Sequence, residues 1–183
     1  MNAVATQSKT FEALKGEFGY ASPMQAPRVL KVIVSTGVGK VNKDKKRLEL
    51  IEGRLERITG QHAAPRAAKK AIANFKSRTG DVVGYQTTLR GAKMQAFLDK
   101  LIHIVLPRVK DFRGLQPKAI DEMGNITIGL REHTVFPETA DEESKDIFGI
   151  AITITTTAKN KKEAEAFFRH LGLPLKDANT DSK

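Results

Sequence analysis

The clearest potential for chemistry lies in the segment Gly37-Val38-Gly39-Lys40. A glycine-bearing turn between a strand and a helix is a common place for binding nucleotide phosphates. A Walker loop, however, requires Ser or Thr after its lysine, and Val41 follows Lys40. A dinucleotide-binding turn requires a third glycine where Asn42 stands. The segment therefore fits a turn or helix start better than a nucleotide site, although its backbone amides could hold an RNA phosphate.

Histidines and acidic side chains form no recognisable catalytic or metal-binding set. The histidines lack HExxH spacing, and His103 lies within a helical pattern, where a structural role is the better interpretation. The acidic segment 141–146 lacks the glycine and spacing of a calcium loop, which favours a solvated loop. With no cysteine, disulfides, zinc ribbons and thiol catalysis are excluded. We therefore expect no enzymatic activity, no catalytic residue, no cofactor and no metal site.

One aromatic side chain stands among cations in the loop Asn74 to Gly80 (NFKSRTG). Phe75 could stack on a base or sugar while Lys76 and Arg78 contact phosphates. The alternative is a hairpin loop whose phenylalanine is tucked into the core, and the pattern alone leaves both possibilities open.

The charge of the chain is divided unevenly along its length. Of the net charge of +10, residues 28–110 carry +13, residues 111–183 carry −3, and the first 27 residues carry none. A basic half beside a near-neutral half indicates an electrostatic footprint for a polyanion, with nucleic acid the leading candidate. The alternative is a basic surface that only keeps the protein soluble.

Hydrophobic periodicity predicts the elements that must position these side chains. Leu48, Ile51, Leu55 and Ile58 form one apolar stripe on a helix that Asn42 could cap and Gly60 ends. A wide apolar face follows Gly91, and Pro107 is expected to end that helix. The expected helices are 10–18, 43–58, 91–106 and 161–170, the last capped by Asn160 with Glu163 in a variant capping box. The expected strands are 29–35, 82–90, 126–131 and 147–157, with a fifth, short one within 61–73.

These elements do not alternate as strand and helix, which favours an α+β fold. We expect a mainly antiparallel four- to five-stranded sheet, helices packed on one face, a free second face and an extended basic loop at 71–84. The 183 residues are expected to form a single domain with an N-terminal helical region at 1–20 and a flexible tail at 175–183. Met1 to Lys9 lacks the apolar stretch of a secretory signal, and no segment is apolar for the ~20 residues needed to span a bilayer. We therefore expect a soluble, cytoplasmic protein.

Several short motifs together resemble the L-five family of bacterial large-subunit ribosomal proteins, which binds 5S ribosomal RNA. They occur in the family's order and span about Phe18 to Pro174. No single one is specific, but the ordered set is. The matching words are 24–29 (MQAPRV), 37–39 (GVG), 59–61 (TGQ), 75–80 (FKSRTG), 88–91 (TLRG), 106–108 (LPR), 111–114 (DFRG), 124–125 (GN), 136–138 (FPE) and 152–158 (ITITTTA).

The resemblance implies a role in the central protuberance of the large ribosomal subunit, without catalysis. Its implied partners are 5S rRNA, large-subunit rRNA, peptidyl-site tRNA and neighbouring ribosomal proteins, including a small-subunit protein at an intersubunit bridge. By position, it implies that Ser35, Gln61 and Thr88 contact 5S rRNA. Together with the basic stretch, the expected rRNA-binding residues are Arg28, Lys31, Ser35, Gln61, Arg66, Lys69, Lys70, Thr88 and Arg90. The expected tRNA-contacting loop comprises Asn74, Phe75, Lys76, Ser77, Arg78 and Thr79.

The chain departs from the family pattern at a few positions. Ser35 stands where the family usually has Asn, so one hydroxyl replaces the paired donor and acceptor of an amide. Ile120 and Ile126 stand where aromatic residues are usual, which indicates altered packing or altered contact. Ala151 replaces an acidic residue.

Two other functions remain open from the residues themselves. A nucleotide-binding enzyme built on Gly37 to Lys40 predicts saturable ATP or GTP binding that Lys40→Ala abolishes. A general basic RNA chaperone predicts equal affinity for unrelated RNAs of the same length.

Overall fold

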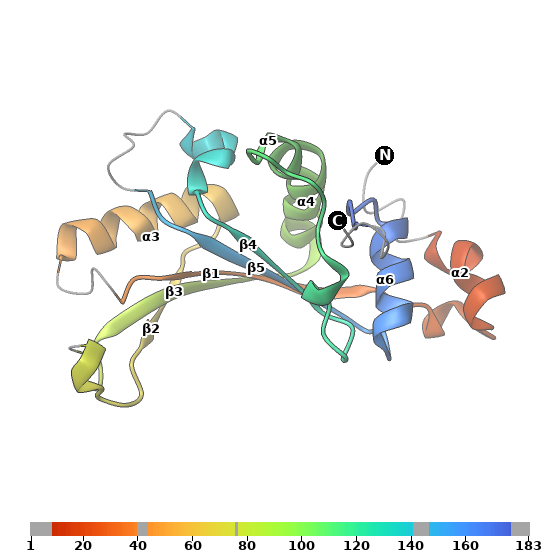
Figure 1. Cartoon of the computed structure of the whole chain (residues 1–183), viewed down its shortest axis with the longest axis horizontal. Coiled ribbons are helices and arrows are strands. Elements are labelled where there is room, and N and C mark those ends of the chain that lie inside the picture. The colour runs from red at the N-terminus through yellow and green to blue at the C-terminus, as the bar shows by residue number, and fades with distance from the viewer. Residues whose placement is uncertain (1–8, 40–43, 76, 141–146, 177–183) are drawn as a thin grey trace, which may run out of the picture. The chain divides into compact units, whose positions relative to one another are not determined.

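The computed structural model describes residues 9–39, 44–75, 77–140 and 147–176 (Figure 1). Its strands form one five-stranded open sheet in the order β2-β3-β1-β5-β4. The strands are β1 (Val29–Gly37), β2 (Ala64–Ala67), β3 (Val82–Leu89), β4 (Ile126–Leu130) and β5 (Ile150–Thr156). The helices are α2 (Thr10–Phe18), α3 (Lys45–Thr59), α4 (Gly91–Lys100), α5 (Leu106–Arg108) and α6 (Lys161–His170). The mainly antiparallel α+β fold expected from the sequence is confirmed.

The chain divides into two compact units, which we describe separately. The first comprises residues 1–32, 90–128 and 153–183, and the second comprises residues 33–89 and 129–152. The second unit contains α3, β2 and β3, and most of the residues expected to bind RNA. The first unit contains α2, α4, α5 and α6.

The apolar stripe expected on α3 is buried in the second unit, where α3 packs against β3. The helix begins at Lys45, and its N-cap is Asp44, whose carboxylate accepts the backbone N–H of Arg47 at 3.3 Å. The expectation that Asn42 caps this helix is therefore wrong, and Asn42 itself lies outside the described residues. Arg54 lies outside the apolar stripe by its spacing, but it is buried, with one guanidinium nitrogen 3.3 Å from Nε2 of the buried His133.

The helical run that starts at Gly91 continues past Pro107 to Arg108, so the expected end at Pro107 is wrong by one residue. Residues Leu101–Val105 form a π-helical segment, and the N–H of Leu106 bonds the carbonyl of Leu101, five residues back. Pro107 lies in the turn that follows and lacks the N–H that a regular helix would use there. The widened turn thus accommodates the proline while the apolar side of the helix stays buried.

Within the first unit, a buried hydrogen bond between Tyr20 and Glu163 joins α6 to the segment that follows α2. The amide oxygen of Asn160 accepts the N–H of Glu163 at 2.9 Å, which confirms the expected N-cap. The Glu163 carboxylate accepts the N–H of Lys159 at 2.7 Å and the hydroxyl of Tyr20 at 2.5 Å. Burial, together with the adjacent Glu163 carboxylate, raises the pKa of Tyr20 far above its ordinary value.

Alternating burial along the central strands leaves one set of side chains partly exposed. In β5 the isoleucines are buried while Ala151, Thr153 and Thr155 are half-buried, and in β1 the half-buried positions include Ile33 and Ser35. A strand with one side against the core and one side toward water has this pattern. We call the partly exposed side the open face of the sheet.

Two of the departures from the family pattern fall in the core of the first unit. Ile120 and Ile126 are both buried and pair through an isolated β-bridge. The isoleucines therefore change packing, and neither side chain is available for an RNA contact. In the described part of the chain, none of the helices has the length and apolar character to cross a lipid bilayer.

Candidate nucleic-acid interface

The open face of the second unit presents a row of small polar side chains. Gln86 and Thr88 on β3 and Ser35 on β1 are all half-buried, whereas Tyr85 and Thr87 lie on the opposite, covered side. Because β3 and β1 are neighbours in the sheet, these three side chains share one surface. The Ser35 hydroxyl donates a long 3.5 Å hydrogen bond to the carbonyl of Ala151 on β5. This surface offers amide and hydroxyl groups suited to RNA backbone and base edges.

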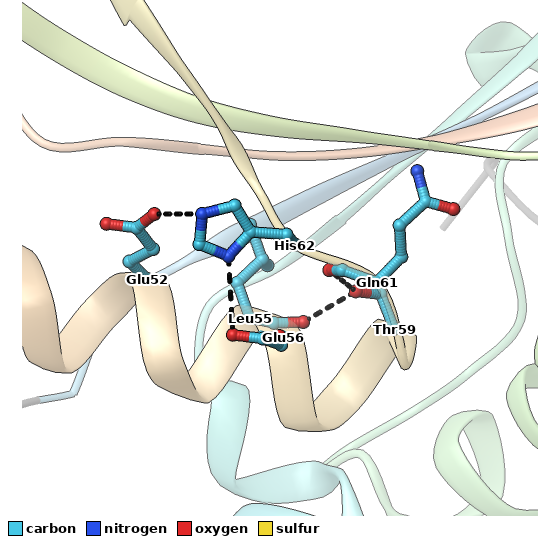
Figure 2. A network of polar contacts seen from close by, with 6 residues as sticks. All are labelled: Glu52, Leu55, Glu56, Thr59, Gln61 and His62. Atoms are coloured by element: carbon cyan, nitrogen blue, oxygen red, sulfur yellow. Dashed lines mark hydrogen bonds and ion pairs between the residues drawn. The ribbon is translucent and has the colours of Figure 1, made fainter.

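Gln61 is brought to this row by the end of α3 (Figure 2). Gly60 adopts the left-handed conformation that ends the helix, with φ of 63°. The Thr59 hydroxyl lies 2.8 Å from the carbonyl of Leu55 and 3.0 Å from that of Gln61, which fixes the turn. The Gln61 amide then donates to the carbonyl of Thr88 at 3.3 Å. The motif Thr59-Gly60-Gln61 is thus a helix end that aims one glutamine at β3.

His62 and two glutamates of α3 form a cluster beside Gln61 that sequence reasoning missed (Figure 2). The His62 ring nitrogens lie 3.2 Å from Glu52 and 3.4 Å from Glu56. Burial and the nearby Glu52 carboxylate raise the pKa of Tyr85. The available signal was two glutamates four residues apart, followed six residues later by a histidine. In the folded chain this cluster places negative charge beside the expected RNA surface.

Arg66 extends the polar row onto the outer strand. Strand β2 pairs antiparallel with β3, with Ala64 opposite Gln86 and Arg66 opposite Gly84. The Arg66 Nε–H donates to the side-chain oxygen of Gln86 at 2.8 Å. Gln86 was not among the expected site residues, although its alternation with Thr88 along β3 could have identified it. The structure therefore brings together Ser35, Gln61, Arg66 and Thr88 of the expected set.

The remaining expected basic residues are divided between the units. Lys69 and Lys70 are exposed in the second unit, directly after β2. Arg28, Lys31 and Arg90 belong to the first unit, where Arg28 and Arg90 are exposed and Lys31 is half-buried. The Arg28 backbone is held by two bonds with Thr157, at 2.9 Å and 3.0 Å.

The loop expected at 71–84 is shorter than predicted. Its last residues, from Val82 onward, belong to β3, and residues Ala73–Phe75 form a 3₁₀ turn. Backbone bonds join Ala68 to Asp81 at 2.8 Å and Gly80 to Ala68 at 3.1 Å. We call residues 68–81 the arm. Lys76 lies outside the described residues.

Phe75 is the most informative side chain of the arm. It is 73% exposed, so the interpretation of this ring as part of the core is wrong. Asn74, Arg78 and Thr79 are also exposed, and Ser77 is half-buried. The arm therefore presents an aromatic ring, an amide, hydroxyls and a guanidinium to solvent, a combination suited to RNA.

The first turn of α3, the helix that follows β1 in the chain, is already capped by an acidic side chain. The helix that follows starts at Lys45, and the carboxylate of Asp44 already accepts the N–H of Arg47 at its first turn. A negative charge at that position disfavours a bound phosphate. Lys40 lies outside the described residues. Within the described ranges, no three His, Asp or Glu side chains gather into a group able to hold a metal ion.

Comparison with known proteins identifies the class to which this sheet and arm belong. Residues 22–78 match the family described as ribosomal protein L5, and residues 82–175 match the model of the C-terminus of the same ribosomal family. The chain belongs to the ribosomal protein L5 family, whose members are structural and not enzymatic.

Curated relatives cover nearly the whole chain. The large ribosomal subunit protein uL5 of Anaeromyxobacter sp. (strain K) is 45% identical over 163 residues, which is 89% of this chain and 91% of that protein. The protein of the same name from Microcystis aeruginosa is 44% identical over the same shares. That from Ureaplasma parvum serovar 3 is 41% identical over 175 residues, 96% of this chain and 95% of the relative.

Proposed function

We propose that this protein is a structural constituent of the large ribosomal subunit in the cytoplasm, and that it binds 5S rRNA through the open face of its sheet. Family membership and the names of the relatives support the ribosomal role. The observation that carries the 5S assignment is the row formed by Ser35, Gln61, Thr88 and Arg66, which projects from three strands and a helix end onto one surface.

The proposal extends to the family's other partners. Large-subunit rRNA is expected against the basic residues that follow β2, and peptidyl-site tRNA against the arm, where Phe75 and Arg78 are exposed. Contacts with neighbouring ribosomal proteins, including a small-subunit protein at an intersubunit bridge, complete the proposed role.

The experiment that tests it is a titration with 5S rRNA and with an unrelated RNA of the same length, at two salt concentrations. Both affinities should fall with salt, because each neutralised duplex phosphate contributes a slope of about −0.9 in log affinity against log salt. A preference for 5S rRNA that persists at the higher salt supports shape- or sequence-specific recognition. Equal affinity for both RNAs at both salts would instead establish the general RNA chaperone.

Two adjacent threonines provide a matched pair of variants for the open face. Thr88→Val removes a half-buried hydroxyl from that face, and we expect 5S affinity to fall about 2- to 10-fold, the worth of one neutral hydrogen bond. Thr87→Val makes the same chemical change on the covered side, where the hydroxyl is buried and has no hydrogen-bond partner among the described residues. Its 5S affinity should remain that of the wild type. Equal losses in both variants would show that the effect does not come from the face.

A second variant separates the arm from the sheet. Arg78 lies in the arm, and the open-face side chains lie on β1, β2, β3 and the end of α3. We expect Arg78→Ala to leave 5S affinity unchanged and to weaken binding of tRNA. Abolition of 5S binding by Arg78→Ala would overturn the division of roles between arm and sheet.

A further inference from the structure

A groove lies on the second unit between the arm, the first turns of α3 and the end of β1. The arm contributes Lys69, Ile72 and Phe75, α3 contributes Arg47 and Ile51, and Ile147 also lines the groove. Neither Ser35 nor Thr88 lines it. The groove is therefore a separate surface from the polar row of the open face.

The groove gathers apolar side chains that folding leaves uncovered. Among the described residues only seven large hydrophobic side chains are exposed, and three of them line this groove. They are Ile72 at 46%, Phe75 at 73% and Ile147 at 38%. Clustered exposed apolar side chains mark a binding surface more often than isolated ones do.

The charge around these apolar side chains is positive. Lys69 and Lys70 are exposed on the arm side, and the half-buried Arg47 of α3 also lines the groove. Asp44 is the only acidic residue of the described lining, and its carboxylate is engaged in capping α3. An occupant with an apolar surface and a negative charge matches this lining.

An unstacked RNA nucleotide has both properties. Its base presents a flat apolar face that stacks on an aromatic ring, and its phosphates pair with lysine and arginine. Such nucleotides occur in single-stranded loops and bulges, where bases are not held in a helix.

We propose that this groove binds one unstacked nucleotide of a single-stranded RNA loop, with the base against Phe75 and Ile72 and the flanking phosphates against Lys69 and Lys70. The inference rests on the proposed function in one respect, namely that the arm meets RNA. It adds a site distinct from the 5S-binding face and states what that site recognises.

The test uses the full-length protein and a short RNA hairpin with 2-aminopurine at one position of its single-stranded loop. Stacking of this base on Phe75 should change its fluorescence on binding. Phe75→Ala should lower hairpin affinity about 5- to 150-fold, the range found when one base-stacking aromatic is removed. Because Phe75 is largely exposed, the variant should keep the thermal stability of the wild type.

Two isoleucines of almost equal exposure give the matched control. Ile72 in the groove is 46% exposed, and Ile104 in the first unit is 44% exposed. Ile72→Ala should weaken hairpin binding measurably, and Ile104→Ala should leave it within about twofold of the wild type. Gly39→Leu supplies a second, independent variant, because no atom lies within 4 Å of the Cβ that it adds. It should obstruct the groove without changing any charge.

Titrations with 5S rRNA on the same variants separate the two proposals. If the Phe75, Ile72 and Gly39 variants bind both 5S rRNA and the hairpin with wild-type affinity, the proposed nucleotide site in the groove is wrong and the 5S assignment stands. Absent 5S binding in the wild type, with hairpin binding that still requires Phe75, would leave the groove standing and remove the 5S assignment.

Competition identifies the occupant. Displacement of the hairpin by unlabelled tRNA, or by large-subunit rRNA, supports the proposal and identifies the source of the nucleotide. A poly-glutamate peptide should displace it only weakly, because it has no base to stack. Displacement by that peptide as effective as by RNA of equal charge would show a site for acidic protein segments and would overturn the proposal.

Discussion

Gly84 is the position at which a single methyl group should do most damage to the proposed 5S surface. A Cβ at Gly84 would lie 2.8 Å from the backbone carbonyl oxygen of Thr36, on the neighbouring strand β1. Real Cβ atoms essentially never approach so closely, and a backbone oxygen cannot turn aside as a flexible side chain can. Gly84→Ala must therefore push apart β3 and β1, the strands that carry Gln86 and Ser35.

The expected cost is that of overpacking, about 1–3 kcal/mol in the free energy of unfolding. Gly129 on β4, in the same unit, provides the control, because its Cβ would meet no atom within 4 Å. Gly129→Ala should be neutral or stabilising by up to about 1 kcal/mol, since alanine restricts the unfolded chain. In urea, with a slope of about 2 kcal/mol per molar, Gly84→Ala should lower the unfolding midpoint by about 0.5–1.5 M.

The two variants should also differ in RNA binding. Gly84→Ala displaces the strand that carries Gln86 and Thr88, so its 5S affinity should fall below that of Gly129→Ala at a temperature where both are folded. An unfolding midpoint for Gly84→Ala at or above that of the wild type would refute the reasoning, because it would show that the strands separate without cost.

Four further outcomes are expected. Tyr20→Phe leaves a buried oxygen of Glu163 without its donor and should cost about 1.5–3 kcal/mol by urea unfolding, more than Tyr85→Phe, whose Glu52 partner is partly exposed. Burial raises the pKa of both tyrosines above 10, so the folded state holds their protons more tightly than the unfolded chain does. The resulting stabilisation is complete below about pH 10 and should be lost as the pH rises above it, which unfolding midpoints measured across that range would show. Asp44→Ala should cost about 1 kcal/mol through loss of the N-cap of α3 yet strengthen hairpin binding, because it removes the acidic residue of the groove. In the free protein we expect the arm to be mobile, because few of its side chains are buried, so the amides of 74–75 and 77–81 should exchange rapidly; slow exchange there would contradict this expectation.

The sequence predicted local structure well where periodicity governs it. The stripe Leu48, Ile51, Leu55 and Ile58 and the alternation of Ile and Thr along β5 each indicated an element and its buried side. Gly60 indicated a helix end for a reason that the structure confirms, since only a residue tolerant of positive φ suits that position.

Predictions failed where a residue's environment is set by a distant part of the chain. Arg54 belongs by spacing to the polar side of α3, but it is buried against His133, which lies 79 residues away. Gln61 and Thr88 were both expected at the site, but the contact between them was not predicted, because it spans 27 residues and depends on the helix end and on β3 together. Whether Phe75 is buried or exposed depends on whether the arm folds back over the phenylalanine ring. The pattern of neighbouring residues in the sequence carries no information on that fold.

The arrangement of Arg66 and Gln86 bears on the entropy of recognition. A free arginine side chain loses about 2 kcal/mol of rotamer freedom when RNA immobilises it. Here the Nε–H is already fixed on Gln86, so part of that freedom is given up during folding rather than at the moment of binding. The guanidinium keeps its remaining N–H donors in a planar fork for a phosphate or a base edge. A lysine at this position would carry the same charge, but its single ammonium group could not bind Gln86 and an RNA phosphate in one fixed geometry. Its side chain would therefore lose its rotamer freedom at the moment of binding.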